Sequence, residues 1–201
     1  NNTFYYIGIK LVSGTPVMNF SATSTPTKTA DTFVDVFSGD QYTSLVGCCY
    51  TLNNSFNFNS LTGRSVVSNW LSFPNQFGIS SAQASHTTTS ATYVDLHADY
   101  DIHIVTNPAG VFYVTVGGYA SNSLAGEDCF ITARAYDAAG VLAATGTESA
   151  MTSAGVGIKG TLVSFLGQPL AQGYYRIEVW AKVSAGTGTF VLQNSLLSLS
   201  S

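Results

Sequence analysis

The sequence predicts an all-β protein: an antiparallel β-sandwich of jelly-roll type, preceded by an irregular β-rich N-terminal region. From residue 82 onward, runs rich in Val, Ile, Tyr, Phe and Thr alternate apolar with polar residues, as half-buried strands do. Gly, Asn and Asp interrupt these runs about every ten residues, which is typical of antiparallel sandwiches. A helical pattern is confined to SVVSNWLSF (65–73), which ends at Pro74, so at most one short helix is predicted.

The N-terminal region comprises residues 1–82, and the polar segment GISSAQAS (78–85) marks its boundary with the sandwich at 83–201. Its first strand is predicted in TFYYIGIKLV (3–12), where every second residue is apolar. Such a strand can pair within its own domain or add to the sheet edge of a neighbouring molecule. We expect residues 1–82 to serve as the attachment or anchoring part.

Eight strands are predicted in the sandwich, a number that fits a jelly roll. In GYYRIEVWAKV (173–183) the residues expected to face the core are Tyr175, Ile177, Val179, Ala181 and Val183. The turn that ends at Gly140 is predicted to close a hairpin, with the glycine at positive φ. The strands are expected near residues 91–96, 101–106, 110–120, 128–136, 140–146, 159–166, 173–183 and 188–198.

A row of acids and imidazoles occupies every second position of DLHADYDIHI (95–104), namely Asp95, His97, Asp99, Asp101 and His103. The intervening residues are mostly apolar, so the row is interpreted as the solvent face of a half-buried strand. Side chains at i and i+2 are roughly 6.5–7 Å apart at their Cα atoms, so five of them cannot share one ion. A metal site, or a metal-dependent hydrolase built on it, would need ligands from another strand or subunit. We therefore predict no metal ligands.

Composition and charge restrict the partners. Charged residues make up 9% of the chain, against roughly 25% in an ordinary soluble domain. This surface suits packing against protein neighbours, or a secreted or particle-borne protein. The net charge is −4 and the basic residues are scattered, so nucleic acid is not an expected partner. No apolar run approaches the ~18 residues that would span a bilayer, so no membrane association is expected.

Catalytic motifs are missing from the sequence. It has no Gly-x-Ser-x-Gly elbow, no HExxH, no phosphate-binding loop and no dinucleotide fingerprint, so we predict no enzyme, no catalytic residue and no cofactor. Cys48, Cys49 and Cys129 are an odd number, which argues against a disulfide framework. Buried free thiols are favoured, and a bridge from Cys129 to Cys48 or Cys49 is the alternative.

Two phrases carry a resemblance to a known family: TTTSATYVDL (87–96) and YYRIEVWAKVSAGTGTFVL (174–192). They resemble the trimeric, tumour-necrosis-factor-like jelly-roll domains of tailed-bacteriophage virion proteins such as head fibres, cement (decoration) proteins and tail-fibre heads. The matching positions are 92–96 and 183–189. The sequence departs from the family at 97–100, where a Pro-Gly-type turn is expected. The resemblance implies homotrimers without a cofactor or an active site.

The function expected from this resemblance is that of a structural virion protein. It would form a homotrimeric head in the virion, as a capsid decoration, head fibre or tail component, and bind other virion proteins such as capsid or tail proteins. Aromatic residues on the non-core faces of two strands, Phe130, Tyr136, Tyr174 and Trp180, are predicted to lie in the subunit interface. The alternatives are a head that binds a receptor or a host surface glycan, and an extracellular filament subunit that assembles by strand donation.

Overall fold

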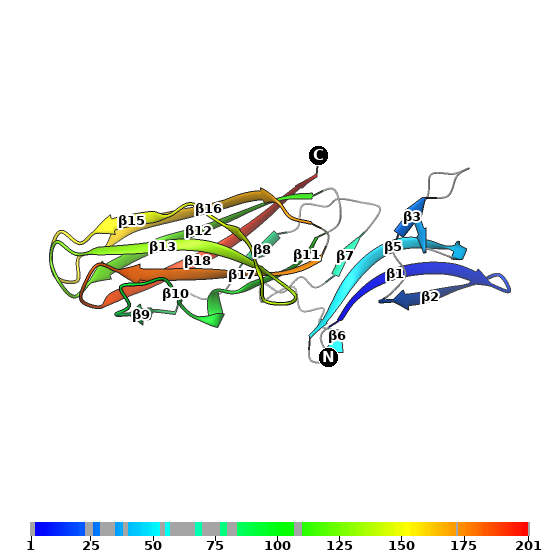
Figure 1. The fold of residues 1–201 in the computed structure, drawn as a ribbon, viewed down its shortest axis with the longest axis horizontal. Helices are drawn as coiled ribbons and strands as arrows, with labels where there is room; N and C mark the ends of the chain where they lie inside the picture. The colour runs from blue at the N-terminus through cyan, green and yellow to red at the C-terminus, as the bar shows by residue number, and fades with distance from the viewer. Residues whose placement is uncertain are drawn as a thin grey trace.

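The computed structural model describes residues 3–22, 26–28, 35–37, 40–52, 55–56, 67–69, 77–79, 84–106, 110–171 and 173–200. Within these ranges the protein is all-β, as predicted, apart from the single 3₁₀ turn η2 (Ala98–Tyr100). Figure 1 shows an elongated molecule with a two-sheet sandwich at one end and a smaller curved sheet at the other. No helix among the described residues is long and apolar enough to cross a membrane.

The first sheet of the sandwich has the order β10-β17-β13-β14. It is formed by β10 (Val94–Asp95), β17 (Gly173–Val183), β13 (Asp128–Asp137) and β14 (Leu142–Thr145). Two further strands extend it: β11 (Ile102–Thr106) pairs with β17, and β15 (Ser149–Thr152) pairs with β13. All of these pairings are antiparallel.

The second sheet has the order β16-β12-β18-β8. It consists of β16 (Gly160–Pro169), β12 (Gly110–Asn122), β18 (Gly188–Ser200) and β8 (Phe77–Ile79), and β9 (His86–Thr88) also pairs with β18. The strand β8 lies on the N-terminal side of the predicted boundary at residue 82 yet pairs with the sandwich. The division into residues 1–82 and 83–201 otherwise stays a prediction.

The strand order identifies the sandwich as a jelly roll. With β8 and β9 counted as the first strand and β10 and β11 as the second, the sheets run first-eighth-third-sixth and second-seventh-fourth-fifth. Each of the last two strands, β17 and β18, is therefore inserted between strands from earlier in the chain, which is the double Greek key of a jelly roll. The predicted fold class is confirmed.

The core lies between the two sheets and follows the predicted alternation. All five β17 residues expected inside are buried, and Ile131, Ala133 and Ala135 of β13 are fully buried opposite them. The β12 side contributes Val114 and Val116, and the β18 side contributes Phe190 and Leu192. The thiols of Cys49 and Cys129 are free and buried, as the favoured prediction stated.

At two positions the backbone geometry requires glycine. Gly140 has φ 79°, as predicted for its hairpin, and the carboxylate of Asp137 accepts bonds from the amides of Ala139 (2.9 Å) and Val141 (2.8 Å) in the same turn. Gly118 lies in β12, where the neighbouring strand comes so close that a Cβ would be 2.2 Å from the carbonyl oxygen of Val191. A side chain at this position would separate β12 from β18.

The N-terminal sheet has the order β2-β1-β5-β4-β3. Its strands are β1 (Thr3–Val12), β2 (Thr15–Ser21), β5 (Asp40–Leu52), β4 (Asp35–Phe37) and β3 (Pro26–Lys28), while β6 (Ser55–Phe56) and β7 (Val67–Asn69) also pair with β5. The short helix expected at 65–73 is wrong at 67–69, because these residues form β7 against β5. The other residues of that stretch lie outside the described ranges.

Candidate functional site

The predicted interface residues lie on the outer face of the first sheet or beneath it. Phe130, Tyr136 and Trp180 alternate with core residues and are half-buried. Tyr174 differs: only 8% of it is exposed, and its hydroxyl is hydrogen-bonded to Nδ1 of the buried His103. Its place on the non-core face follows the predicted alternation, and there β11 brings His103 against it. The interface role of the four residues stays a prediction.

Cations cover the outer aromatic residues of this first sheet. The guanidinium of Arg134 lies over the Trp180 ring, and the ammonium of Lys182 lies 4.6 Å from the centroid of the Phe130 ring and 4.5 Å from that of Tyr93. The Tyr93 hydroxyl donates to Glu148 (2.6 Å), which also pairs with Lys182 (3.3 Å). We call these six residues the cation–aromatic network. Its aromatic rings already have partners within the same molecule.

Glu178 is 3% exposed and lies beside this network on β17. Its carboxylate pairs with Arg176 and accepts a bond from the Trp180 indole nitrogen (2.7 Å). The i and i+2 spacing places Arg176 on the same face of β17 as Glu178, which allows this ion pair. The carboxylate is therefore satisfied, as a buried charge has to be.

The outer face of the second sheet has less cover: among the described residues one cation lies over it, the Lys159 ammonium 4.3 Å from the centroid of the Tyr119 ring. Cross-strand partners on β12 and β16 place Tyr113 beside Gly167 and Thr115 beside Phe165. The exposed fraction is 45% for Tyr113 and 55% for Phe165. None of the outward positions on these two strands is charged: Tyr113, Thr115, Gly117, Tyr119, Thr161, Val163, Phe165 and Gly167. We call these eight residues the bare sheet face. The alternation of β12 and β16 could have indicated it.

The expected row of acids and imidazoles does not form one strand. β10 ends at Asp95, η2 follows, and β11 begins only at Ile102. The interpretation of five side chains on one solvent face is therefore wrong, and His103 is buried on the far side of the interruption. η2 occupies the positions where the resemblance implied a turn, and its residue Tyr100 is fully buried.

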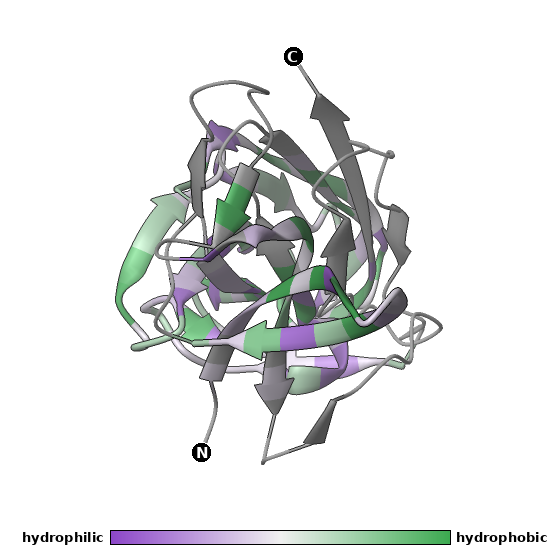
Figure 2. Ribbon diagram, turned by 90° about the vertical axis from the view of Figure 1, so that its right-hand side faces the viewer, coloured by the Kyte–Doolittle hydropathy of each residue, from purple (hydrophilic) through white to green (hydrophobic). Residues whose placement is uncertain are grey.

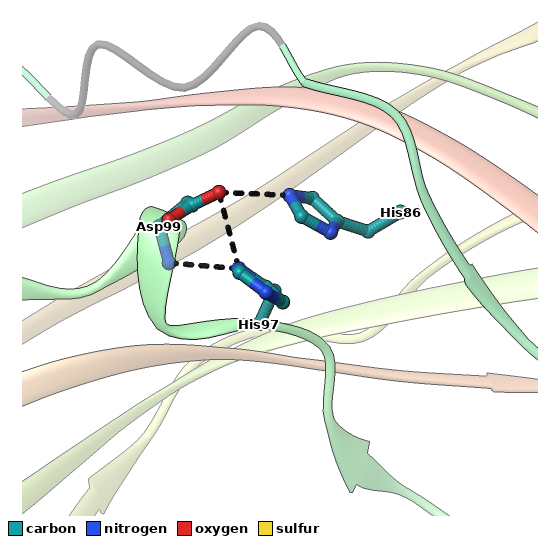
Figure 3. A group of neighbouring side chains, drawn as sticks. All are labelled: His86, His97 and Asp99. Atoms are coloured by element: carbon teal, nitrogen blue, oxygen red, sulfur yellow. Dashed lines mark hydrogen bonds and ion pairs between the residues drawn. The ribbon is translucent and has the colours of Figure 1, made fainter.

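Two members of the row meet a histidine from another strand in a compact cluster (Figure 3). One carboxylate oxygen of Asp99, Oδ2, lies 3.3 Å from Nε2 of His86 and 3.2 Å from Nδ1 of His97. The two imidazole rings stack with centroids 3.9 Å apart and planes 18° apart. These three residues are the only group among the described residues whose His, Cys, Asp and Glu donor atoms converge closely enough to bind a metal ion.

The elements that hold the cluster are fixed to the core. His86 begins β9 and lies opposite Phe190 of β18 in the sheet register. The buried Tyr100 hydroxyl donates to the carbonyl of Ala84 (2.7 Å), two residues before His86, and its ring packs edge-on against the His86 ring. His97 caps η2 by accepting the amide of Asp99 at Nδ1 (3.2 Å). The sequence did not indicate His86 as a member of this cluster, because only tertiary pairing brings β9 close to η2.

Comparison with known proteins adds a general likeness of fold. No protein-family profile and no curated protein matches the sequence. A solved structure of the tumour necrosis factor Eiger from S. frugiperda is similar, with TM-score 0.41, 15% identity and coverage of 58% of this chain and 85% of that one. The VP2 subviral particle of infectious bursal disease virus gives TM-score 0.49 and 10% identity over 98% of this chain.

The protein spans about half of the virus protein, 51% of the VP2 chain. A second structure of infectious bursal disease virus, of the Gt strain, gives TM-score 0.48 with 11% identity and covers 53% of that chain. At these identities the likeness concerns the jelly-roll architecture alone, which the strand order already defines.

Proposed function

We propose that this protein is a structural virion protein of tailed-bacteriophage type, whose jelly roll forms a homotrimeric head and whose N-terminal sheet attaches to capsid or tail proteins. The bare sheet face carries this proposal. An exposed, uncharged face with aromatic and branched residues is costly in water and suited to burial between subunits. The trimeric state is what the sequence resemblance implies.

The contrast between the two sheets supports the bare sheet face as the contact. Phe130 and Trp180 of the first sheet are packed beneath Lys182 and Arg134 of their own chain, so a partner would have to displace those cations. Phe165 and Tyr113 on the second sheet are exposed without such a cover. Burying them gains roughly 25 cal/mol per Å² of apolar surface. We therefore place the subunit contact on β12 and β16.

The attachment role of the N-terminal sheet is supported by an apolar surface on the β1–β2 hairpin, at the end of the molecule that faces the viewer in Figure 2. The register pairs Ile9 with Met18 and Ile7 with Phe20, so these side chains share one face. The exposed fraction is 58% for Met18 and 69% for Leu11 on the same face. β2 is also an edge strand of its sheet, which leaves an edge for a partner strand.

Light scattering of the purified protein coupled to size exclusion tests the trimer. The wild type is expected at three times the chain mass of 21.2 kDa. Phe165→Asp should convert it to monomer, because a buried unpaired carboxylate opposes the contact. Val156→Asp is the matched control, since Val156 is exposed in a loop outside the bare sheet face and should leave the trimer intact. A wild type that is monomeric at micromolar concentration overturns the trimeric head.

The virion assignment is tested on particles. Antibodies raised against the purified protein should label regularly spaced positions on intact particles in electron micrographs, and the protein should be found by mass spectrometry after the particles are washed in high salt. Its absence from washed particles overturns the assignment even if the trimer is real.

A glycan-binding head is the second candidate, favoured by one hollow. A pocket of about 410 Å³ is lined by Gly117, Gly118, Tyr119, Val191, Leu192 and Gln193. Tyr119 offers a ring for stacking on a sugar, and Gln193 offers an amide for hydroxyl groups. The pocket borders the bare sheet face, so trimer formation and sugar binding there compete. A glycan array in which Gln193→Ala loses the signal would support this candidate, and an array without a ligand removes it.

Strand donation by residues 1–12 is not part of the proposal. β1 pairs with β2 along one edge and with β5 along the other, so its backbone groups are already used within the same chain. Donating β1 to a neighbour would require both ladders to break.

A further inference from the structure

We propose that His86, His97 and Asp99 form a binding site for a divalent transition metal ion of the Zn²⁺ type. This site is independent of the proposed virion role, and nothing in the bare sheet face or the N-terminal hairpin bears on it. The prediction of no metal ligands rested on a single strand being unable to make its side chains converge. η2 and β9 remove that objection, since they supply ligands from two segments.

Two electron-rich atoms, Nδ1 of His97 and Oδ2 of Asp99, face each other. The amide of Asp99 donates to Nδ1 of His97, so this nitrogen presents a lone pair and not a proton. Oδ2 of Asp99 nevertheless lies 3.2 Å from the same nitrogen. A carboxylate oxygen and an imidazole lone pair at this distance repel each other unless a positive charge lies between them. A bound cation supplies that charge.

An independent observation is the buried ring nitrogen of His86. Its Nε2 atom is buried and makes no hydrogen bond to the described residues, although Oδ2 of Asp99 lies 3.3 Å from it (Figure 3). Buried polar atoms in native structures nearly always have a partner, so an unpartnered one requires an explanation. A metal ion coordinated by Nε2 and Oδ2 together would satisfy both atoms.

The donor distances suit a tetrahedral ion. Zn²⁺ binds imidazole nitrogen at about 2.0–2.1 Å and carboxylate oxygen at about 2.0–2.2 Å, which places neighbouring ligand atoms of a tetrahedron about 3.3–3.5 Å apart. The distance between Nε2 of His86 and Oδ2 of Asp99 is 3.3 Å, which agrees with this value. Two imidazoles and one carboxylate favour Zn²⁺, Co²⁺ or Ni²⁺, whereas Mg²⁺ and Ca²⁺ take oxygen ligands.

Binding requires one ring to turn. A metal ion lies close to the plane of each imidazole that coordinates it. The planes of two stacked rings whose centroids are 3.9 Å apart, at 18° to each other, meet only at a point far from both rings. The side chain of His86 is 15% exposed and packs against Tyr100, whereas that of His97 is 47% exposed. We therefore infer that the His97 ring rotates about its Cβ–Cγ bond and exchanges the Asp99 amide for the ion.

The remaining coordination position faces solvent. Half of the Asp99 side chain is exposed (50%), so water can complete the tetrahedron. The ion would join η2 to the segment that begins β9 and so stabilise the folded chain by mass action, because only the folded chain holds His86 beside His97 and Asp99. Because the site lies on the outside of the sandwich and joins two segments, we assign it a structural role and not a catalytic one.

The test is a calorimetric titration of the full-length protein, stripped with a chelator, with ZnCl₂ at neutral pH. One Zn²⁺ ion per chain is expected, and the thermal unfolding temperature should rise with Zn²⁺ and stay constant with Mg²⁺. His86→Gln and Asp99→Asn should each weaken binding by about tenfold or more, the loss produced even by removing a supporting partner of a ligand. Glu127→Gln, an acid remote from the cluster, is the matched control and should bind as the wild type does.

A second measurement uses only the wild-type protein, so it does not depend on whether the variants fold. In the wild type, the imidazole proton resonances of His86 and His97 should shift on addition of Zn²⁺, while those of His103 should not. No heat of binding up to millimolar Zn²⁺ overturns the proposal and leaves protonated imidazoles paired with Asp99 as the explanation of the short contacts. Binding that persists unchanged in both variants overturns it as well, because the ion then lies elsewhere.

Discussion

The guanidinium carbon of Arg134 lies 4.2 Å from the centroid of the Trp180 ring. Arg134 comes from β13 and Trp180 from β17, and the planar cation covers the ring on the outer face of the first sheet. Tyr93 contacts the same guanidinium at 5.4 Å. The arginine thus holds two aromatic residues of the cation–aromatic network in place.

Replacing this arginine by lysine should destabilise the fold even though the charge is kept. Arg134→Lys is expected to lower the free energy of unfolding by about 1 kcal/mol, because an ammonium cannot stack its face on the indole. Urea denaturation followed by Trp fluorescence measures this. Val156→Ala, at an exposed loop position, is the control and should change the value by less than about 0.5 kcal/mol. Equal effects of both substitutions would contradict the stacking argument.

The Glu148 carboxylate should make stability depend on acid pH. The hydrogen bond from Tyr93 and the charge of Lys182 hold its pKa below the ordinary value of 4.5. A carboxyl whose folded pKa is lowered stabilises the fold above its unfolded pKa, and this contribution is lost as pH falls through the folded pKa. The wild type should therefore unfold at a higher temperature than Glu148→Gln near neutral pH, and the difference should vanish in acid.

Thermal unfolding of both proteins over this pH range measures the difference. The double variant with Tyr93→Phe shows whether the hydrogen bond is the cause, because the two substitutions should then be non-additive. A difference between wild type and Glu148→Gln that is the same at every pH would refute the assignment.

Gly118→Ala should be among the most damaging small substitutions in the sandwich. The added methyl group would meet the Val191 carbonyl at 2.2 Å, so β12 and β18 have to separate. We expect a loss of about 3 kcal/mol or more in the free energy of unfolding. Gly117→Ala is the matched control, because its Cβ would meet nothing nearer than 3.8 Å. Chemical denaturation of the two variants decides, and similar losses would contradict the close approach of the strands.

Tyr100→Phe should loosen the segment before β9. The hydroxyl is buried and bonds the Ala84 carbonyl, so its removal leaves that carbonyl without this donor and costs about 1–3 kcal/mol. Amide hydrogen exchange should increase for residues 84–88 more than for β13. Tyr119→Phe, at an exposed ring on the second sheet, is the control. Unchanged exchange at 84–88 in Tyr100→Phe would show that the hydroxyl does not hold this segment.

The sandwich was largely predictable because its strands obey a local rule. In β17 every second residue is apolar, and this set is buried as the alternation requires: Tyr175, Ile177, Val179, Ala181 and Val183. Short strands escape the rule: β9 and β15 each have too few residues to show a period. The alternation also continues through residues 97–101 although the chain turns there, so the pattern could not reveal η2.

The candidate site was less predictable because it depends on contacts between distant segments. Asp99 and His97 were assigned to the solvent face of a strand without metal ligands, and their partner His86 is brought by the pairing of β9 with β18. Likewise Tyr174 was predicted to lie in a subunit interface, and the sequence did not reveal that β11 places His103 beside it. Sequence patterns identify which side chains leave the core, and only the fold decides what they meet.

The insertion of β18 between β12 and the short strands β8 and β9 has a consequence during synthesis. One edge of β12 has no partner until β18 has been synthesised, so this sheet edge stays open while residues 123–187 are made. Polypeptides released early, before Gly188, would keep that edge and are expected to aggregate. Synthesis of β18 thus closes the exposed edge of the second sheet.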